Sequence, residues 1–270
     1  MSVFRPNYEK PGKGVPEDGS QEVNVVRFFQ IVGRKFWGMV GINVIQLIGN
    51  LPALAAAGFW LGFKFGALSS GDADEQLWFM LMAGFLAVST QIVTIGPVQA
   101  GFIYTMRNYA REENAFVWSD FMKGIRENWK RSLAVAAIDL LVFYVLSCVY
   151  SFYTTAEGSP AVIVSLSKFV LGVLALLYTM MHLYIYPMMV TLDLNVKQLY
   201  GNAWRFAIGK FIPNLLIVAL LVGFDVLIFY VSAYFGMIII SIIGYSLTGF
   251  LATFYTYPAI DKYIIQKVKS

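Results

Sequence analysis

Long apolar runs separated by short polar segments fill most of the chain after residue 35. Six of these runs are long enough to supply the ~20 apolar residues that a helix needs to cross a bilayer. They lie at about residues 36–62, 77–104, 133–153, 161–190, 214–234 and 238–258. The pattern predicts an all-α polytopic membrane protein with six transmembrane helices.

The N-terminal region is first polar and then amphipathic. Residues 1–22 are rich in proline, glycine and charge and lack the apolar core of a cleaved signal peptide, so we expect a disordered cytoplasmic tail. Just after it, Arg27 and Arg34 alternate with apolar residues, which is typical of a short helix in the membrane interface. The alternative is that this segment is the start of the first span. The membrane domain is predicted to cover residues 23–270.

The basic residues are distributed unevenly across this layout. With six spans, 18 of the 20 Lys and Arg residues fall on the side that carries both termini. Lys64 falls on the other side, and Lys168 lies within a span. Because cytoplasmic loops carry the excess of Lys and Arg, both termini are predicted to be cytoplasmic, in a multi-pass protein of the plasma membrane.

The spans carry related motifs. The segment IDLLVFYV at 138–145 is similar to FDVLIFYV at 224–231, and INVI at 42–45 is a fainter match. Among the even-numbered spans, Tyr-x-Tyr-Pro occurs at 184–187 and again at 255–258. The motifs predict three repeated hairpins, at about residues 23–109, 117–195 and 204–270. The alternative is chance similarity, since membrane helices draw on few residue types.

Proline lies near the predicted inner end of each even-numbered span. A helix from Leu77 to Tyr109 would run ~50 Å, well beyond the ~30 Å hydrocarbon core. We therefore expect Pro-kinked even helices, bent at Pro97, Pro187 and Pro258, that extend into the cytoplasm and build a collar with the linking segments.

One linking segment, residues 119–130, has the pattern of an amphipathic helix. Ser119 or Asp120 can cap it, and its apolar stripe includes Phe121 and Trp129. Such a helix is expected to lie flat at the inner leaflet or to pack into a groove on a partner.

Composition excludes several functional classes. Hydrophobic residues make up 58% and charged residues 13% of the chain, and the net charge of +4 comes from bases that punctuate apolar runs, which disfavours nucleic-acid binding. One histidine and one cysteine cannot build a conventional metal cluster, and there is no phosphate-binding glycine loop or GxSxG motif. We therefore expect no enzymatic activity, no catalytic residues, no metal and no cofactor.

The stretch from Thr94 to Ser132 resembles a known family. Pro97, Tyr104 and Arg107, followed by AREENAFVWSDF and RENWKRS, together with FFQIVGRKFWGMVGIN near the N-terminus, resemble the YesL family of bacterial membrane proteins. The resemblance implies a six-helix membrane protein of unknown function, often encoded beside carbohydrate ABC importers and glycan-degrading enzymes. It implies no established catalytic residues.

The resemblance and the predicted collar together favour one function. We expect an accessory or regulatory membrane subunit, surrounded by lipid, that docks on the permease or ATPase subunits of a bacterial carbohydrate ABC importer. The residues expected near the partner are Arg107, Arg111, Phe121, Ile125 and Trp129.

Four ionisable residues inside apolar runs suggest an alternative. Charged groups within spans are costly and often functional, and these four are Asp139, Lys168, His182 and Asp225. By depth, we expect Asp139 to pair with His182 and Asp225 with Lys168. They either line the polar path of a small autonomous transporter or channel, or form buried pairs that fix helix packing. A further alternative is a membrane scaffold or signalling protein.

Overall fold

The computed structural model describes residues 23–64, 94–155 and 160–266, and every element in these segments is helical. In chain order the named elements are α1 (Val25–Lys64), α3 (Val117–Thr155), α4 (Ala161–Met189), α5 (Val196–Gly209), α6 (Phe211–Val231), α7 (Ala233–Ile239), the π-helix η1 (Ile240–Gly244), α8 (Tyr245–Ile260) and the π-helix η2 (Asp261–Ile265). A further helical segment, residues 94–110, precedes α3. The predicted tail at residues 1–22 lies outside the described residues.

Five helical segments in the described part of the chain are long and apolar enough to cross a membrane. They are Val25–Ala56, Val117–Tyr153, Ala161–Met189, Phe211–Ile228 and Tyr234–Ile265. The chain is therefore a multi-pass membrane protein by the length and composition of its helices. Most of the expected second span lies outside the described residues, so the predicted number of six is left open by the fold.

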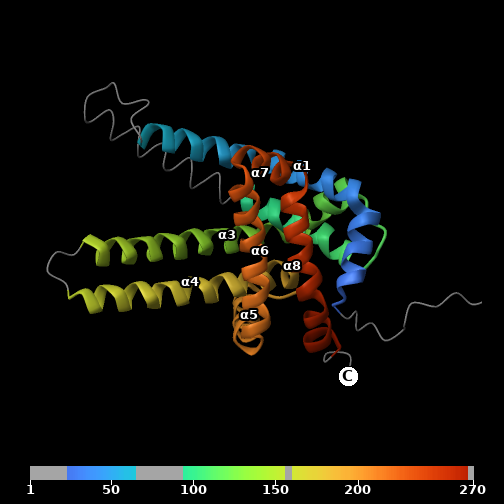
Figure 1. Cartoon of the computed structure of the whole chain (residues 1–270). Helices are drawn as coiled ribbons and strands as arrows, with labels where there is room; N and C mark the ends of the chain where they lie inside the picture. Colours follow the sequence, from blue (N-terminus) through green and yellow to red (C-terminus); the bar gives the residue numbers. More distant parts are fainter. Residues whose placement is uncertain (1–22, 65–93, 156–159, 267–270) are drawn as a thin grey trace, which may run out of the picture.

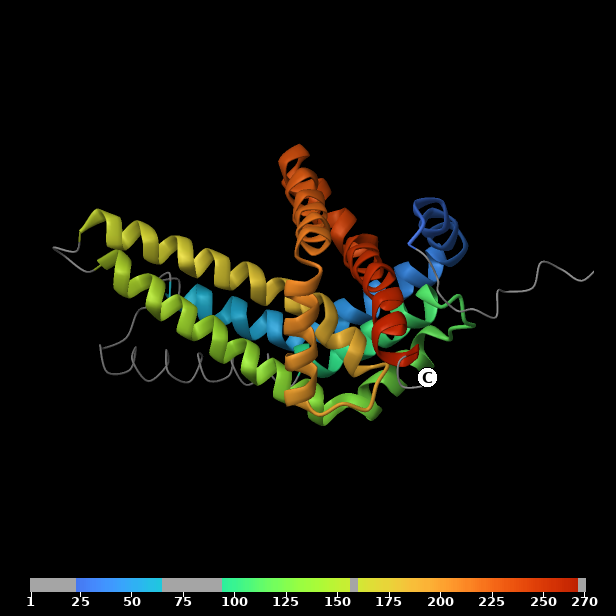
Figure 2. The ribbon, with the colours of Figure 1, turned by 90° about the horizontal axis from the view of Figure 1, so that it is seen from below.

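The helices converge at one end of the molecule, which we call the packed core. All residues from Gly101 to Ala110 are buried there, as are those from Met180 to Val190 apart from His182. Residues of α1, α5 and α8 complete the same cluster. Figures 1 and 2 show α3 and α4 extending side by side away from this core, while α6 runs in a different direction.

Two glycines allow the helical segment 94–110 to cross α3 at very close range. A Cβ atom added to Gly124 would lie 2.9 Å from Gly101 Cα and 2.5 Å from Tyr104 Cβ. A Cβ atom added to Gly101 would lie 2.6 Å from the carbonyl oxygen of Phe121. Because the two backbones touch, the crossing depends on the absence of side chains, as at small-residue interfaces between membrane helices.

The linking segment that contributes Gly124 to this crossing differs from the expected separate interfacial helix. Residues 119–130 belong to α3, which continues without a break from Val117 to Thr155. No glycine or proline stands between residues 125 and 155 to interrupt the helix. Asp120 lies in the first turn, where its carboxylate accepts the backbone N–H of Phe116 at 3.0 Å. The amphipathic segment and the apolar run are thus one rigid element.

Of the three expected hairpins, the second contains a packed pair in the described part of the chain, formed by α3 and α4, whereas most of the second helix of the first lies outside the described residues. In the third, α8 packs on α1 and on α4 rather than along α6. The helices continue through Pro187 in α4 and Pro258 in α8, so a bend at these residues stays a prediction. At the other end of the chain, α1 is one helix from Val25, without a break before the predicted first span.

An asparagine of α1 holds the π-helix η1 in place. Asn43 is fully buried, and its Nδ2 donates to the carbonyls of Ile240 (3.0 Å) and Ser241 (2.6 Å). Its Oδ1 accepts the backbone N–H of Ser246 at 2.9 Å. A π-helix shifts the hydrogen-bond ladder by one residue, and Asn43 pairs the backbone groups at both ends of that shift.

Candidate functional site

A cluster of polar side chains lies where α3, α4 and α5 meet. Asp139 Oδ1 accepts from the Tyr178 hydroxyl (2.6 Å) and from the Tyr200 hydroxyl (3.2 Å), and it lies 2.9 Å from His182 Nε2. Tyr178 and His182 are one turn apart on α4, whereas Tyr200 comes from α5. The structure thus brings Asp139 and His182 together, which confirms the predicted pairing and adds two phenols to it.

The contacts of this cluster indicate which of its groups carry protons. His182 Nδ1 lies 3.1 Å from the carbonyl of Tyr178, so both ring nitrogens face acceptors, an arrangement that suits a doubly protonated imidazolium. Burial raises the pKa of the Tyr200 phenol, which keeps it a hydrogen-bond donor. The cluster can store a proton, and it ties α5 to the α3–α4 pair.

A second polar centre joins the repeated tyrosine motifs. Tyr184 and Tyr255, the first tyrosines of the two Tyr-x-Tyr-Pro segments, both donate to Asn214 Oδ1, at 2.7 and 2.9 Å. Asn214 Nδ2 donates in turn to the carbonyl of Phe206 at 3.0 Å. Equivalent positions on α4 and α8 therefore converge on one buried amide of α6, deep in the packed core.

Arginines fix the connections around the packed core. Arg107 is only 8% exposed, donates to the carbonyl of Val190 and lies 4.2 Å from the ring centroid of Tyr104. Arg131 Nη1 reaches the same connection between α4 and α5, donating to the carbonyl of Leu194 and to Asp193 Oδ1, each at 3.1 Å. Two guanidinium groups from different helices thus hold one loop.

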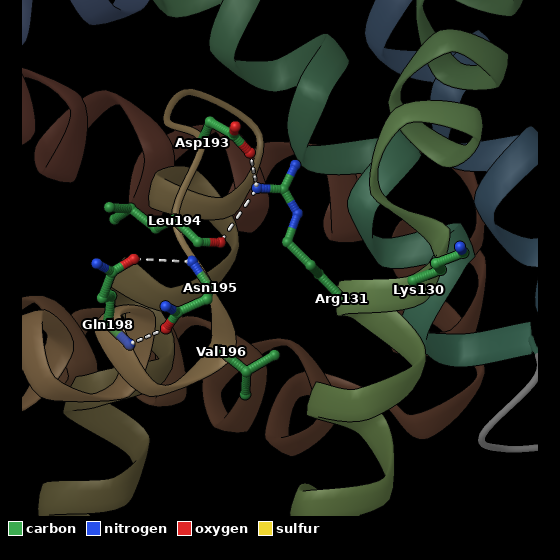
Figure 3. Close-up of a pocket in the computed structure, with 7 residues that line it drawn as sticks. All are labelled: Lys130, Arg131, Asp193, Leu194, Asn195, Val196 and Gln198. Carbon is green, nitrogen blue, oxygen red and sulfur yellow. Dashed lines mark hydrogen bonds and ion pairs between the residues drawn. The ribbon is translucent and has the colours of Figure 1, made fainter.

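Figure 3 shows the surface cavity of about 540 Å³ that this loop borders. Arg131 points at Asp193 and Leu194, whereas Lys130 points away from them. Asn195 and Gln198 form a capping box at the start of α5, with bonds of 3.0 and 2.9 Å. Apart from Lys130, the polar side chains of this cavity are engaged with one another or with the loop backbone, so we assign it a structural role.

The segment after helix 94–110 is held by a glutamate in an unusual backbone conformation. Glu112 has a φ of 57°, and the N–H of Glu113 donates to the carbonyl of Asn108 at 3.0 Å, which together make a Schellman ending. The Glu112 carboxylate accepts from Arg34 and from Arg27 Nε, the latter at 2.8 Å. The Arg34 hydrogen bond lowers the pKa of Glu112.

The five residues expected at a docking surface are not equally available. Arg107 and Phe121 are buried, because each fills the packed core, so they are not presented to a partner. Ile125 packs against the same core. Arg111 forms an ion pair with Glu113 at 2.8 Å and remains partly exposed, and Trp129 is 48% exposed. A docking role stays a prediction for Arg111 and Trp129.

The structure adds exposed aromatic residues beside Trp129. Trp118 is 64% exposed and lies on the same side of α3, because the eleven residues between positions 118 and 129 make just over three full turns. Phe116, just before the helix, is also exposed, and Lys123 and Arg126 are exposed on the same helical segment. We call Phe116, Trp118 and Trp129 the aromatic surface of α3.

Lys168 and Asp225 are not paired as expected. Lys168 Nζ lies 5.9 Å from the ring centroid of Tyr150, on the neighbouring helix of the α3–α4 pair. Asp225 lies in a separate cavity beside η1 and α8. The prediction was wrong because it rested on depth alone, whereas α6 runs away from the outer part of α4.

Sequence reasoning missed several residues that organise these sites. The INVI segment was noted as a faint repeat, and the polar residue in it, Asn43, is the one that pairs with η1. Asn214 could have been found as a lone amide at the start of an apolar run. Tyr200 carried no such signal, because a tyrosine in an amphipathic segment is unremarkable.

Comparison with known proteins gives one family match. The model of a family described as a protein of unknown function, DUF624, matches residues 75–150. No curated protein and no solved structure matches the chain. The match includes the glycine crossing, the Glu112 turn and the start of α3, so this chain is similar to that family in the segment that builds much of the packed core.

Proposed function

We propose that this protein is an accessory integral membrane subunit of the YesL type, associated with a bacterial carbohydrate ABC importer. The observation that carries the proposal is the aromatic surface of α3. Trp118 and Trp129 are exposed on a helix that is anchored in the packed core through the nearby Phe121 and Gly124. Large aromatic side chains on a rigid element are typical of the anchors of protein interfaces.

The proposed location in the membrane is supported by α3 and its neighbour α4. None of the most apolar window of α4 is buried, and little of that of α3 is. In the described part of the chain, the apolar parts of α3 and α4 that extend away from the packed core therefore expose apolar surface to lipid or to helices of another subunit. The aromatic surface sits at the opposite end of α3, which the distribution of Lys and Arg assigns to the cytoplasm, where an ATPase would be reached.

We also propose that the protein has six spans and that its partner is a carbohydrate importer. The helical segment 94–110 is the expected end of the second span, which would bring the five described candidates to six. A carbohydrate importer is proposed because of the resemblance to the YesL family, and the matched family segment supports that resemblance.

The experiment is purification of the tagged chain from its native membrane in a mild detergent, with identification of co-purifying proteins. The proposal expects permease or ATPase subunits of a sugar importer, and altered sugar uptake when the gene is deleted. Recovery of the chain alone, together with unchanged uptake, would contradict it.

An autonomous transporter is the second candidate, favoured by the Asp139–His182 pair within the helices. In that case reconstituted vesicles should take up a solute, and Asp139→Asn should slow the uptake. Uptake that is the same in Asp139→Asn and Asp225→Asn would rule out a polar path through these residues. A scaffold or signalling role differs from the first proposal only in the partner that the purification would recover.

A further inference from the structure

A cavity of about 340 Å³ opens between α6, the helical segment 94–110 and the junction of η1 with α8. Four of the side chains that line it carry oxygen atoms: Gln99, Asp225, Tyr245 and Thr248. Its remaining walls are mostly apolar, including Phe102, which lies against Gly249 so closely that an added Cβ there would be 2.3 Å from the ring. The cavity is separate from the Asp139 cluster and from the loop cavity of Figure 3.

Asp225 is the charged group of this cavity. It lies within the candidate span Phe211–Ile228. Among the described residues, no base forms an ion pair with it. An unpaired carboxylate at membrane depth is costly, so it requires either a proton or a mobile positive charge.

A buried amide behind the cavity wall is also incompletely paired. Gln46 of α1 is 3% exposed, and its Nε2 donates to Gln99 Oε1 at 2.9 Å. In the described part of the chain, no donor reaches Gln46 Oε1. Gln46 does not itself line the cavity, but its hydrogen bond fixes the orientation of the Gln99 amide and leaves one lone pair of Gln99 Oε1 available.

Thr248 supplies a third type of oxygen. Its hydroxyl hydrogen is directed to the carbonyl of Gly244 or Tyr245, at 3.0 and 3.1 Å. The lone pairs of the Thr248 oxygen are therefore free to face another group. The backbone at this wall is the π-helix, whose shifted carbonyls at Ile240 and Ser241 are already occupied by Asn43.

From this arrangement we infer that the cavity binds a monovalent inorganic cation, such as Na⁺, through Asp225, Gln99 and Thr248. One carboxylate with neutral amide and hydroxyl oxygens balances a single positive charge. Hard oxygen ligands suit alkali and alkaline-earth ions, and the described residues contain no cluster of three His, Cys, Asp or Glu side chains for a transition metal. The volume leaves room for part of the ion's hydration shell. The inference does not depend on the proposed partner.

The test measures thermal unfolding of the full chain in detergent while NaCl or KCl replaces N-methylglucamine chloride at constant ionic strength and pH. Wild-type protein should show a saturable rise in unfolding temperature with one of the two cations, and Asp225→Asn should lose that rise. Gln99→Ala should need a higher cation concentration for the same rise. Glu127→Gln, which removes an exposed carboxylate of α3, is the matched control and should respond like the wild type.

Direct binding separates the cation from a proton. Equilibrium binding of ²²Na⁺ (or ⁸⁶Rb⁺, if KCl gives the rise) should saturate in the wild type and Glu127→Gln and be absent in Asp225→Asn. Equal responses of wild type and Asp225→Asn would overturn the inference. So would an unfolding temperature that changes with pH but with neither cation, since Asp225 would then hold a proton. Size-exclusion chromatography of each variant confirms that it is folded before the comparison.

Discussion

The crossing of helix 94–110 and α3 makes Gly124→Ala a sharp test of the packed core. The added Cβ would lie 2.9 Å from Gly101 Cα and 3.0 Å from the carbonyl oxygen of Ala100. These are backbone atoms, so relief requires the two helices to move apart. Overpacking of this kind costs about 1–3 kcal/mol, whereas alanine in place of a helical glycine contributes about 1 kcal/mol of stability. We expect a net loss of stability.

The chain contains a matched control for this substitution. Gly201 lies inside α5, is exposed, and has no atom within 4 Å of an added Cβ. Gly201→Ala should therefore show the helix-propensity gain alone and stabilise the protein by about 0.5–1 kcal/mol. The two variants make the same chemical change and differ only in the space around it.

The assay is thermal unfolding in detergent, followed by the fluorescence of the six tryptophans. Gly124→Ala should unfold at a lower temperature than the wild type, and Gly201→Ala at the same or a higher temperature. A Gly124→Ala protein as stable as Gly201→Ala would refute the close crossing.

Three further predictions concern polar contacts. The hydrogen bond from Arg34 lowers the pKa of Glu112. The Glu112 carboxylate therefore stabilises the fold above its unfolded pKa and loses that effect as the pH falls through its folded pKa. The difference in unfolding temperature between the wild type and Glu112→Gln should be present at neutral pH and disappear in acid. A gap that does not depend on pH would contradict this. Asn43→Leu leaves backbone groups of the π-helix unpaired and should destabilise the protein by at least about 1–3 kcal/mol in thermal unfolding, and an unchanged midpoint would argue against the cap. Arg131→Lys keeps the charge but loses the several N–H donors of the planar guanidinium group, so hydrogen exchange of residues 192–195 should become faster. Unchanged exchange would show that the loop is held by other contacts.

The helical class, the apolar segments and one polar pair were predictable from the sequence. Apolar length alone identifies the spans, because a membrane imposes a fixed thickness on them. The Asp139–His182 contact was predictable because both residues interrupt apolar runs at similar depth in consecutive spans.

The directions in which the helices leave the core were not predictable in the same way. Sequence patterns show which face of a helix is apolar, but an apolar face can pack against lipid or against another helix. The sequence therefore carried no signal that Asp225 and Lys168 lie apart. The role of Arg107 was misread for a related reason. A basic residue after a span is usually solvated, and only the fold shows that Val190 and Tyr104 surround it.

The continuity of α3 changes the meaning of the segment from Thr94 to Ser132. This segment combines the glycine crossing, the Glu112 turn and the first half of α3. A contact made at Trp118 or Trp129 would therefore act on a rigid helix that continues into the apolar part of α3. This rigidity is what makes the aromatic surface a suitable place for a partner to dock.

The most direct test of the proposed function is photo-crosslinking in living cells with benzoylphenylalanine at positions 118 and 129. Position 144, where Tyr144 is exposed in the apolar part of α3, serves as the lipid-facing control. The account predicts that positions 118 and 129 crosslink to a permease or ATPase subunit of a sugar importer and that position 144 does so less. Absence of these subunits from the adducts at both tryptophan positions would contradict it.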